Sequence, residues 1–330
     1  MATYLKSIQN GLFKIFEEFE NAYLLGEDIE DPYGGAFKVT AGLHAKYPNR
    51  VITTPISEAA IIGVGNGLAL RGMKPILEIM FGDFLTLCTD QIVNHAAKFH
   101  KMYGKELDLP VIIRTPMGGG RGYGPTHSQT LEKILLGTPN IRIVAPSIYH
   151  DPGKLLVSLS RNNNKLTVFI ENKLLYGKEL VVDNVVMEEE ITDFPTAIVR
   201  NFDPAATQPD ITIICYGGIS RFLLEVLPNM KLEEINIEAV LPSVITSIPE
   251  KTILKYTKRS GKIIIAEEGT KGFNWGSEMA SFIYENQYNQ LKAPIARLSS
   301  DEDIIPTSST QEDVMLISKD KIEKAITQLL

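Results

Sequence analysis

The sequence predicts an α/β protein in which helices cover both faces of parallel sheets. Runs of β-branched and other apolar residues alternate with helix-like segments along most of the chain. Within these runs apolar residues follow one another without polar alternation, which is typical of strands buried on both faces. Several runs end at a glycine, a proline or an acid, as strands that lead into a loop do. A length of 330 residues predicts two such domains.

The first domain is expected to span residues 1–185. An amphipathic helix is expected within residues 1–24, with Leu5, Ile8, Leu12, Ile15 and Phe16 on one face. Helices are also expected at 57–70, where Ser57 is a suitable N-cap, and at 89–101. Strands are expected at 22–26, 50–54, 74–80, 109–114, 141–145 and 167–171. This β-α-β rhythm favours a parallel sheet.

The second domain is expected to span residues 209–330. Between the two, residues 186–208 contain an acidic cluster and two prolines, which favours a surface linker with one or two strands in or near it. Strands are then expected at 210–216, 235–241 and 262–266. Helices are expected to start at Ser220 and to cover 275–288 and 319–330.

Composition excludes several classes of function. The formal net charge of -7 argues against a nucleic-acid partner. The two cysteines, Cys88 and Cys215, lie in apolar runs, which favours buried thiols in a reducing compartment over a disulfide or a metal site. No signal peptide and no long uncharged apolar stretch occur, so we expect a soluble cytoplasmic protein without a membrane partner.

A glycine-rich loop carries the first candidate site residue, His127. Five glycines between Gly118 and Gly124 precede it, directly after an apolar strand-like run. Glycines let a backbone approach a ligand closely, and a histidine titrates near neutral pH, so the pair is suited to proton transfer. A surface loop with a solvated histidine is the alternative interpretation.

Glu58 is the second candidate. It follows Thr53-Thr-Pro-Ile-Ser and begins a helix otherwise rich in Ala, Ile, Val and Leu. A carboxylate at this position can simply cap the helix and interact with its dipole. Because its neighbours are apolar, its side chain can also enter a dry environment, with a raised pKa, and share a proton with a ring nitrogen. Both interpretations stay open.

Phe81 and Phe84 follow a strand at the sheet edge where α/β proteins bind ligands. Packing in the core is the ordinary role for such rings, and stacking on a flat heterocycle is the alternative. Gly63-Val-Gly-Asn-Gly67 lies inside a helical pattern, so we read it as helix packing and not as a nucleotide fingerprint. The sequence contains no Walker loop, CxxC, HExxH or GxSxG motif, so no metal ligands are predicted.

Taken together, these segments resemble the β subunits of thiamine-diphosphate-dependent 2-oxoacid dehydrogenases, a family that is transketolase-like. The resemblance covers nearly the whole chain. It rests on Leu25-Gly-Glu-Asp28, Thr54-Pro-Ile-Ser-Glu58, Phe81-Gly-Asp-Phe84 with Asp90-Gln-Ile-Val-Asn94, Thr126-His-Ser-Gln129 and Ile170-Glu-Asn-Lys-Leu-Leu-Tyr-Gly177. It implies a pyrimidine-binding domain followed by a transketolase C-terminal-type domain.

The resemblance also implies roles for the candidate residues. Glu58 would hydrogen-bond N1′ of the cofactor's aminopyrimidine and so activate thiamine diphosphate, and Phe84 would stack on the pyrimidine. His127 would assist proton transfer or position the acyl acceptor, usually a lipoyl group on an acyltransferase. The reaction implied is oxidative decarboxylation of a 2-oxoacid.

Partners follow from the same resemblance. In this family a Gly-Asp-Gly…Asn motif on an α subunit holds the diphosphate and Mg²⁺, and this chain lacks that motif. An α2β2 heterotetramer that is inactive without its α subunit is therefore expected. Asn162 stands where the family usually has an aspartate of a monovalent-cation site, which puts a bound potassium ion in question. The loop of residues 118–124 also departs from the common pyruvate-type sequence.

Two other functions are compatible with these residues. The C-terminal part of a split transketolase-like enzyme would use Glu58 in the same way, but would need cationic groups for sugar phosphates, and Arg121 is the one arginine within the loop of 118–124. A non-catalytic interaction subunit would need neither Glu58 nor His127.

Overall fold

The computed structural model describes residues 2–104 and 107–330, so residue 1 of the first expected domain lies outside it. The chain forms two compact units, each with its own sheet. The first consists of Met1–Met117, Gly137–Val144 and Asp151–Glu179, and the second of Gly118–Leu136, Ala145–His150 and Leu180–Leu330. No helix in the described part of the chain is long and apolar enough to cross a bilayer.

The first unit contains a six-stranded sheet whose strands all run parallel. Its order is β2 (Val51–Thr53), β1 (Ala22–Gly26), β3 (Lys74–Glu78), β4 (Ile112–Met117), β6 (Thr167–Asn172) and β5 (Arg142–Val144). Every residue of β4 and β6 is buried, including the charged Arg114 and Glu171. Because β2, β1 and β3 are adjacent and parallel, their carboxyl ends lie side by side at one edge of the sheet.

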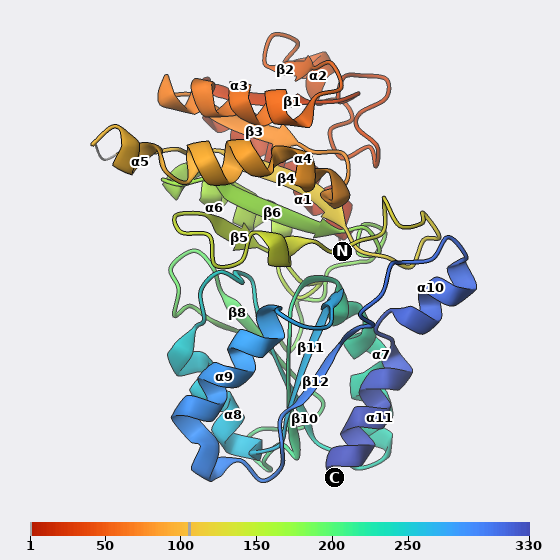
Figure 1. Ribbon diagram of the computed structural model, residues 1–330. Helices are drawn as coiled ribbons and strands as arrows, with labels where there is room; N and C mark the ends of the chain where they lie inside the picture. Colours follow the sequence, from red (N-terminus) through yellow and green to blue (C-terminus); the bar gives the residue numbers. More distant parts are fainter. Residues whose placement is uncertain (1, 105–106) are drawn as a thin grey trace. The chain divides into compact units, whose positions relative to one another are not determined.

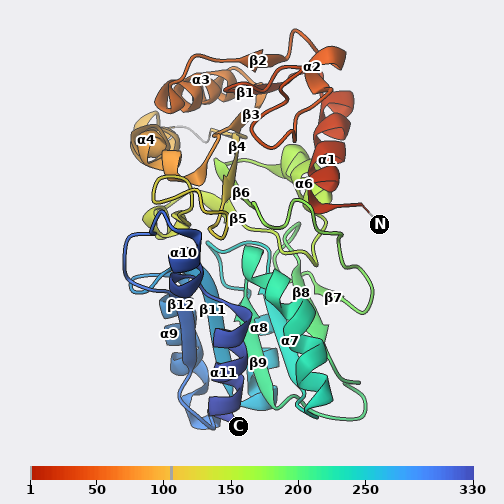
Figure 2. The same cartoon turned by 90° about the vertical axis from the view of Figure 1, so that its right-hand side faces the viewer.

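Helices cover both faces of this sheet (Figure 2). α1 (Tyr4–Glu18) and α6 (Pro152–Asn162) lie on one face, and α3 (Glu58–Leu70) and α4 (Leu85–Thr89) lie on the other. Two short helices, α2 (Leu43–Lys46) and α5 (Phe99–Met102), complete the unit. α1 and α6 cross so closely that a Cβ on Gly11 would lie only 2.7 Å from Gly153 Cα. The Ser7 hydroxyl joins them by donating to Asp151 Oδ1 at 2.6 Å and accepting from the Gly153 N–H at 3.0 Å.

The second unit contains another six-stranded sheet with helices on both faces (Figure 1). Its order is β12 (Ala296–Ser300), β11 (Ile263–Thr270), β9 (Ile211–Cys215), β10 (Ile237–Pro242), β8 (Thr196–Arg200) and β7 (Val186–Glu188). β8 runs antiparallel to β10, and β7 antiparallel to β8. One face carries α7 (Ser220–Leu232) and α11 (Lys319–Leu329), and the other carries α8 (Glu250–Ser260) and α9 (Trp275–Gln287). A shorter helix, α10 (Ser309–Met315), precedes α11.

Residues 186–208 were expected as a surface linker with one or two strands, and two strands, β7 and β8, lie there and pair into the second sheet. One segment differs from the expectation. The helix expected at 89–101 is divided into α4, a π-helical stretch over Asp90–Ala96, and α5. Within the π-helical stretch, the Gln91 carbonyl accepts from the Asn66 side chain of α3 at 3.1 Å.

Candidate functional site

The carboxyl edge of the first sheet carries Glu58. The chain leaves β2, the Thr54 N–H donates to the Gly26 carbonyl of β1 at 2.9 Å, and α3 begins four residues later. Glu58 is the first residue of that helix and is only 7% exposed. Ser57 occupies the N-cap position without a capping hydrogen bond from its side chain. A buried carboxyl group therefore stands at the positive end of an apolar helix.

Glu27 is the acid that the sequence did not single out. It directly follows β1 and is 7% exposed, and its Oε1 atom has no hydrogen-bond partner within the described chain. Burial raises the pKa of Glu27, and the negative charges of Glu58 and Asp28 raise it further. The charge of Glu58, at the start of α3, thus acts on Glu27 at the end of β1. Gly26-Glu27-Asp28 at a strand end was the signal that could have revealed it.

Phe84 lies in a short 3₁₀ turn, Gly82–Phe84, soon after β3. Its half-buried ring packs edge-on against Phe81, with ring centroids 5.9 Å apart and planes at 74°. Gly82 is required in this turn because a Cβ there would lie 2.3 Å from Met117 Cγ. The fold thus brings Glu58, after β2, and Phe84, after β3, to the same edge of one sheet, with β1 between the two strands.

A buried network of charges lies below this edge. Arg114 of β4 donates to Glu78 of β3 at 2.8 Å and to both carboxylate oxygens of Glu171 of β6, at 2.7 and 3.0 Å. The Tyr176 hydroxyl donates to the same Glu171 at 2.7 Å. Burial alone would lower the pKa of Arg114, but the two carboxylates raise it above its usual value. The guanidinium therefore stays charged and ties three strands together near the candidate site.

His127 belongs to the second unit. His127 is half-buried. Its backbone N–H donates to the Gly124 carbonyl at 3.3 Å, and its ring Nδ1 atom lies 2.9 Å from Thr126 Oγ1. The loop before it has four glycines with positive φ, at positions 118, 120, 122 and 124, which explains the glycine-rich sequence.

Asn162, which puts the family's monovalent-cation site in question, is the last residue of α6. The Asn163 side-chain oxygen accepts from Arg142 at 2.9 Å and from the Thr167 hydroxyl at 3.1 Å. Among residues 2–104 and 107–330, no group of three or more His, Cys, Asp or Glu side chains is arranged to hold a metal ion.

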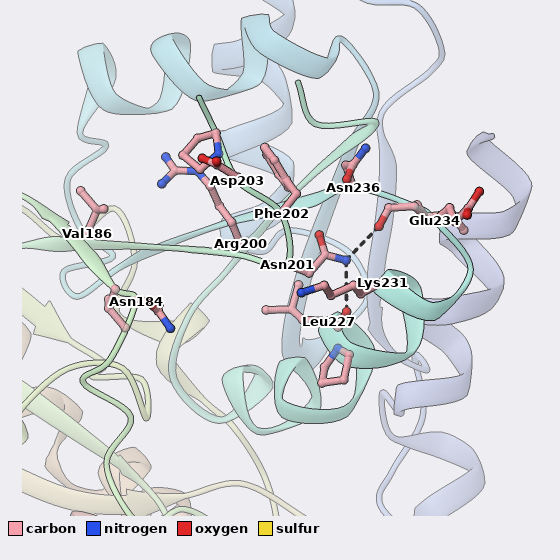
Figure 3. Close-up of a pocket in the computed structure, with 14 residues that line it drawn as sticks. Asn184, Val186, Arg200, Asn201, Phe202, Asp203, Leu227, Lys231, Glu234 and Asn236 are labelled. Atoms are coloured by element: carbon pink, nitrogen blue, oxygen red, sulfur yellow. Dashed lines mark hydrogen bonds between the residues drawn. The ribbon is translucent and has the colours of Figure 1, made fainter. Parts of the chain in front are cut away.

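A pocket of about 780 Å³ lies elsewhere in the second unit, beside the end of α7 (Figure 3). Its lining includes Arg200, Asn201 and Lys231, and none of the residues predicted from the sequence. The Asn201 amide donates to the carbonyls of Leu227 and Ile235, and Arg200 is paired with the buried Glu238. Asn201 and Arg200 are thus engaged in contacts that stabilise the pocket lining. We therefore do not assign the catalytic chemistry to this pocket.

Comparison with known proteins identifies the family. The model of the transketolase pyrimidine-binding domain matches residues 1–179, and that of the transketolase C-terminal domain matches residues 203–322. The 2-oxoisovalerate dehydrogenase subunit beta of Bacillus subtilis is 32% identical over 99% of this chain and 98% of its own. The chain belongs to the family of 2-oxoacid dehydrogenase β subunits.

Other members of the family are equally similar. The pyruvate dehydrogenase E1 component subunit beta of Gracilaria tenuistipitata is 33% identical and covers 95% of each chain. A subunit beta of acetoin:2,6-dichlorophenolindophenol oxidoreductase from Cupriavidus necator is 32% identical over 92% of this chain and 89% of its own. A solved structure described as a split gene transketolase, inactive beta4 tetramer, has a TM-score of 0.78 and 16% identity, and covers 100% of this chain and 99% of its own. The expected α/β fold is thereby confirmed.

Proposed function

We propose that the chain forms half of a thiamine-diphosphate site in an α2β2 2-oxoacid dehydrogenase that transfers an acyl group to a lipoyl carrier. The observation that carries the proposal is the buried Glu58 at the start of α3, beside Glu27 and on the sheet edge that presents Phe84. Mg²⁺ and the diphosphate would be held by the α subunit.

The residues present fit the pyrimidine end of the cofactor. A carboxyl group at 7% exposure needs a polar partner, and a ring nitrogen supplies one. Glu27 Oε1 is a second buried oxygen without a hydrogen bond in the described chain. Glu58 would hold N1′, and the half-buried Phe84 would stack on the ring. When bound, thiamine diphosphate supplies the electron sink that allows a 2-oxoacid to lose CO₂.

The chain's own residues handle protons in this scheme. Glu58 holds a proton toward the pyrimidine nitrogen. The raised pKa of Glu27 keeps that neighbour protonated to a higher pH than usual, so the two acids need not both be charged. His127 assists proton transfer or positions the acyl acceptor.

The outer face of α3 supports the need for a partner. Its exposed residues carry no charge and are Ala59, Ala60, Val64, Gly67 and Leu70. A helix that is apolar on all sides is normally buried. We therefore expect this face to be covered by another subunit in the complete enzyme.

Calorimetry with thiamine diphosphate and Mg²⁺ tests the shared site. We expect tight binding to the complex co-expressed with its α subunit and none to this chain alone. Glu58→Gln should weaken binding and lower 2-oxoacid turnover by about 100-fold or more, as loss of an acid-base group does. The matched control is Glu20→Gln, because Glu20 is a solvent-exposed acid at the end of the first helical segment. Tight binding to the isolated chain, or a fully active Glu58→Gln complex, would overturn the proposal.

A further inference from the structure

The loop before His127 has an unusual backbone. φ is +99° at Gly118, +83° at Gly120, +67° at Gly122 and +75° at Gly124, so every second residue has a left-handed conformation. Alternation of this kind turns successive N–H groups toward the same side and forms a concave nest that attracts an anion. A loop of this kind can present two alternating backbone N–H groups to one carboxylate.

The carboxylate of Glu312 occupies this nest. Its Oε1 atom accepts from the Gly120 N–H at 3.0 Å, and its Oε2 atom accepts from the Gly122 N–H at 2.7 Å. Glu312 is fully buried, at 0% exposure. Next to it, the Gly119 N–H donates to Glu268 Oε1 at 2.8 Å. Hydrogen bonds to a carboxylate are stronger than those between neutral groups. Both oxygens of Glu312 therefore stabilise the loop through such bonds.

Glu312 is itself held firmly. It lies in α10, where its N–H donates to the Ser308 carbonyl and its carbonyl accepts from Leu316, both at 2.9 Å. The loop packs so closely against the residue after α10 that a Cβ on Gly119 would lie 2.5 Å from Leu316 Cδ1. Ile305, Met315 and Leu316 form a small apolar cluster that supports this segment.

The glycine content of the loop makes its shape depend on its anchors. Glycines lose more conformational freedom on ordering than other residues, so a loop with five of them between residues 118 and 124 relaxes when its anchors are removed. The bonds from the Gly119, Gly120 and Gly122 N–H groups to Glu268 and Glu312 anchor its backbone.

We propose that Glu312 is a positioning residue, whose carboxylate fixes the loop of residues 118–124 in the conformation that presents His127. The link to His127 is direct, since the His127 N–H donates to the carbonyl of Gly124, the last glycine of the nest. The inference rests on the proposed function for the role of His127, but the order of the loop is independent of that role.

Limited proteolysis tests the loop itself. Arg121 is exposed within the loop, so trypsin cleavage after it, followed by mass spectrometry, measures how often the loop opens. In the full chain, Glu312→Gln should increase cleavage there by about tenfold or more, because a neutral amide replaces the carboxylate that accepts two N–H groups. Glu312→Asp keeps both oxygens and should lie between. Asp313→Asn, at an exposed acid of the same helix, should cleave like the unmodified chain. Equal cleavage of Glu312→Gln and Asp313→Asn would overturn the proposal.

Kinetics in the complex with the α subunit test the consequence. Glu312→Gln should lower kcat, with a correctly folded complex verified by its melting temperature. Adding Glu312→Gln to His127→Ala should then cause no further loss, because both changes remove the same function. A full additional loss in the double variant would overturn the link to His127. A complex without any 2-oxoacid activity would contradict the proposed function, and the cleavage rates would still decide whether Glu312 holds the loop.

Discussion

At the scale of single residues, two buried acids in the second unit have unusual protonation. Burial raises the pKa of Glu132 to about 7 and that of Glu267 to about 8. The Tyr216 hydroxyl donates to Glu132, and Glu267 accepts from the Gly276 N–H at 2.9 Å. After burial, the negative charge of Glu132 raises the pKa of Glu267 further. Both are therefore protonated over part of the neutral range.

Stability should consequently fall as pH rises. The folded pKa values lie above the ordinary value of 4.5, so the stabilisation from the protonated forms is complete below about pH 4.5 and is lost as pH rises through about 7 and 8. Glu267→Gln stays neutral, so its melting temperature should decline less between about pH 5 and about pH 8.5 than that of the unmodified chain. Glu278→Gln, at an exposed acid of α9, is the control. An unchanged pH slope for Glu267→Gln would contradict this expectation.

At the scale of elements, the packing of α3 on β3 depends on one glycine. A Cβ on Gly65 would lie 2.4 Å from Leu77 Cδ1, and Leu77 is completely buried. On Gly67 of the same helix a Cβ would meet no atom within 4 Å. The two glycines thus differ in packing although they share the helix.

Alanine substitutions should separate these two roles. Gly65→Ala should lower the free energy of unfolding by about 1–3 kcal/mol, because the added methyl group overpacks the interface. Gly67→Ala should raise it by about 0.5–1 kcal/mol, because alanine favours helix. Urea unfolding of the full chain measures both. Equal effects of the two substitutions would show that the contact with Leu77 does not limit the packing.

At the scale of the whole molecule, the uncharged face of α3 should decide assembly. Val64 is 53% exposed at its centre. Val64→Glu would bury a charge in a subunit interface, so we expect the chain to fold but to lose its co-purification with the α subunit. Leu232→Glu adds the same charge at another exposed apolar residue and should assemble normally. A Val64→Glu complex with the unmodified size in gel filtration would exclude this face from the interface.

Much of the architecture was predictable, because most strands here contain several consecutive apolar, often β-branched residues. The elements that escaped prediction have weaker patterns. α8 buries mostly polar side chains, among them Thr252, Thr257 and Ser260, and β12 is a half-exposed edge strand with Arg297 at its second position. Local sequence carries little signal for either, since neighbouring elements decide their burial.

The candidate site shows the same limit. Glu58 could be selected because an apolar helix follows it, and its assigned role, like those of Phe84 and His127, stays a prediction. Glu27 gains its raised pKa from burial and from Glu58, which approaches only in the folded sheet. The glycines of the nest are visible in the sequence, but Glu312 lies 192 residues from Gly120. Only the fold reveals which carboxylate they bind.

The edge strands of the two sheets have a consequence for the chain before it binds its partner. Three of the four edge strands, β2, β5 and β7, are only three residues long. The fourth, β12, carries the exposed charge of Arg297. Short or charged edge strands offer few free backbone groups for pairing with a strand of another molecule. Newly made chains can therefore accumulate and wait for assembly without polymerising through their sheets.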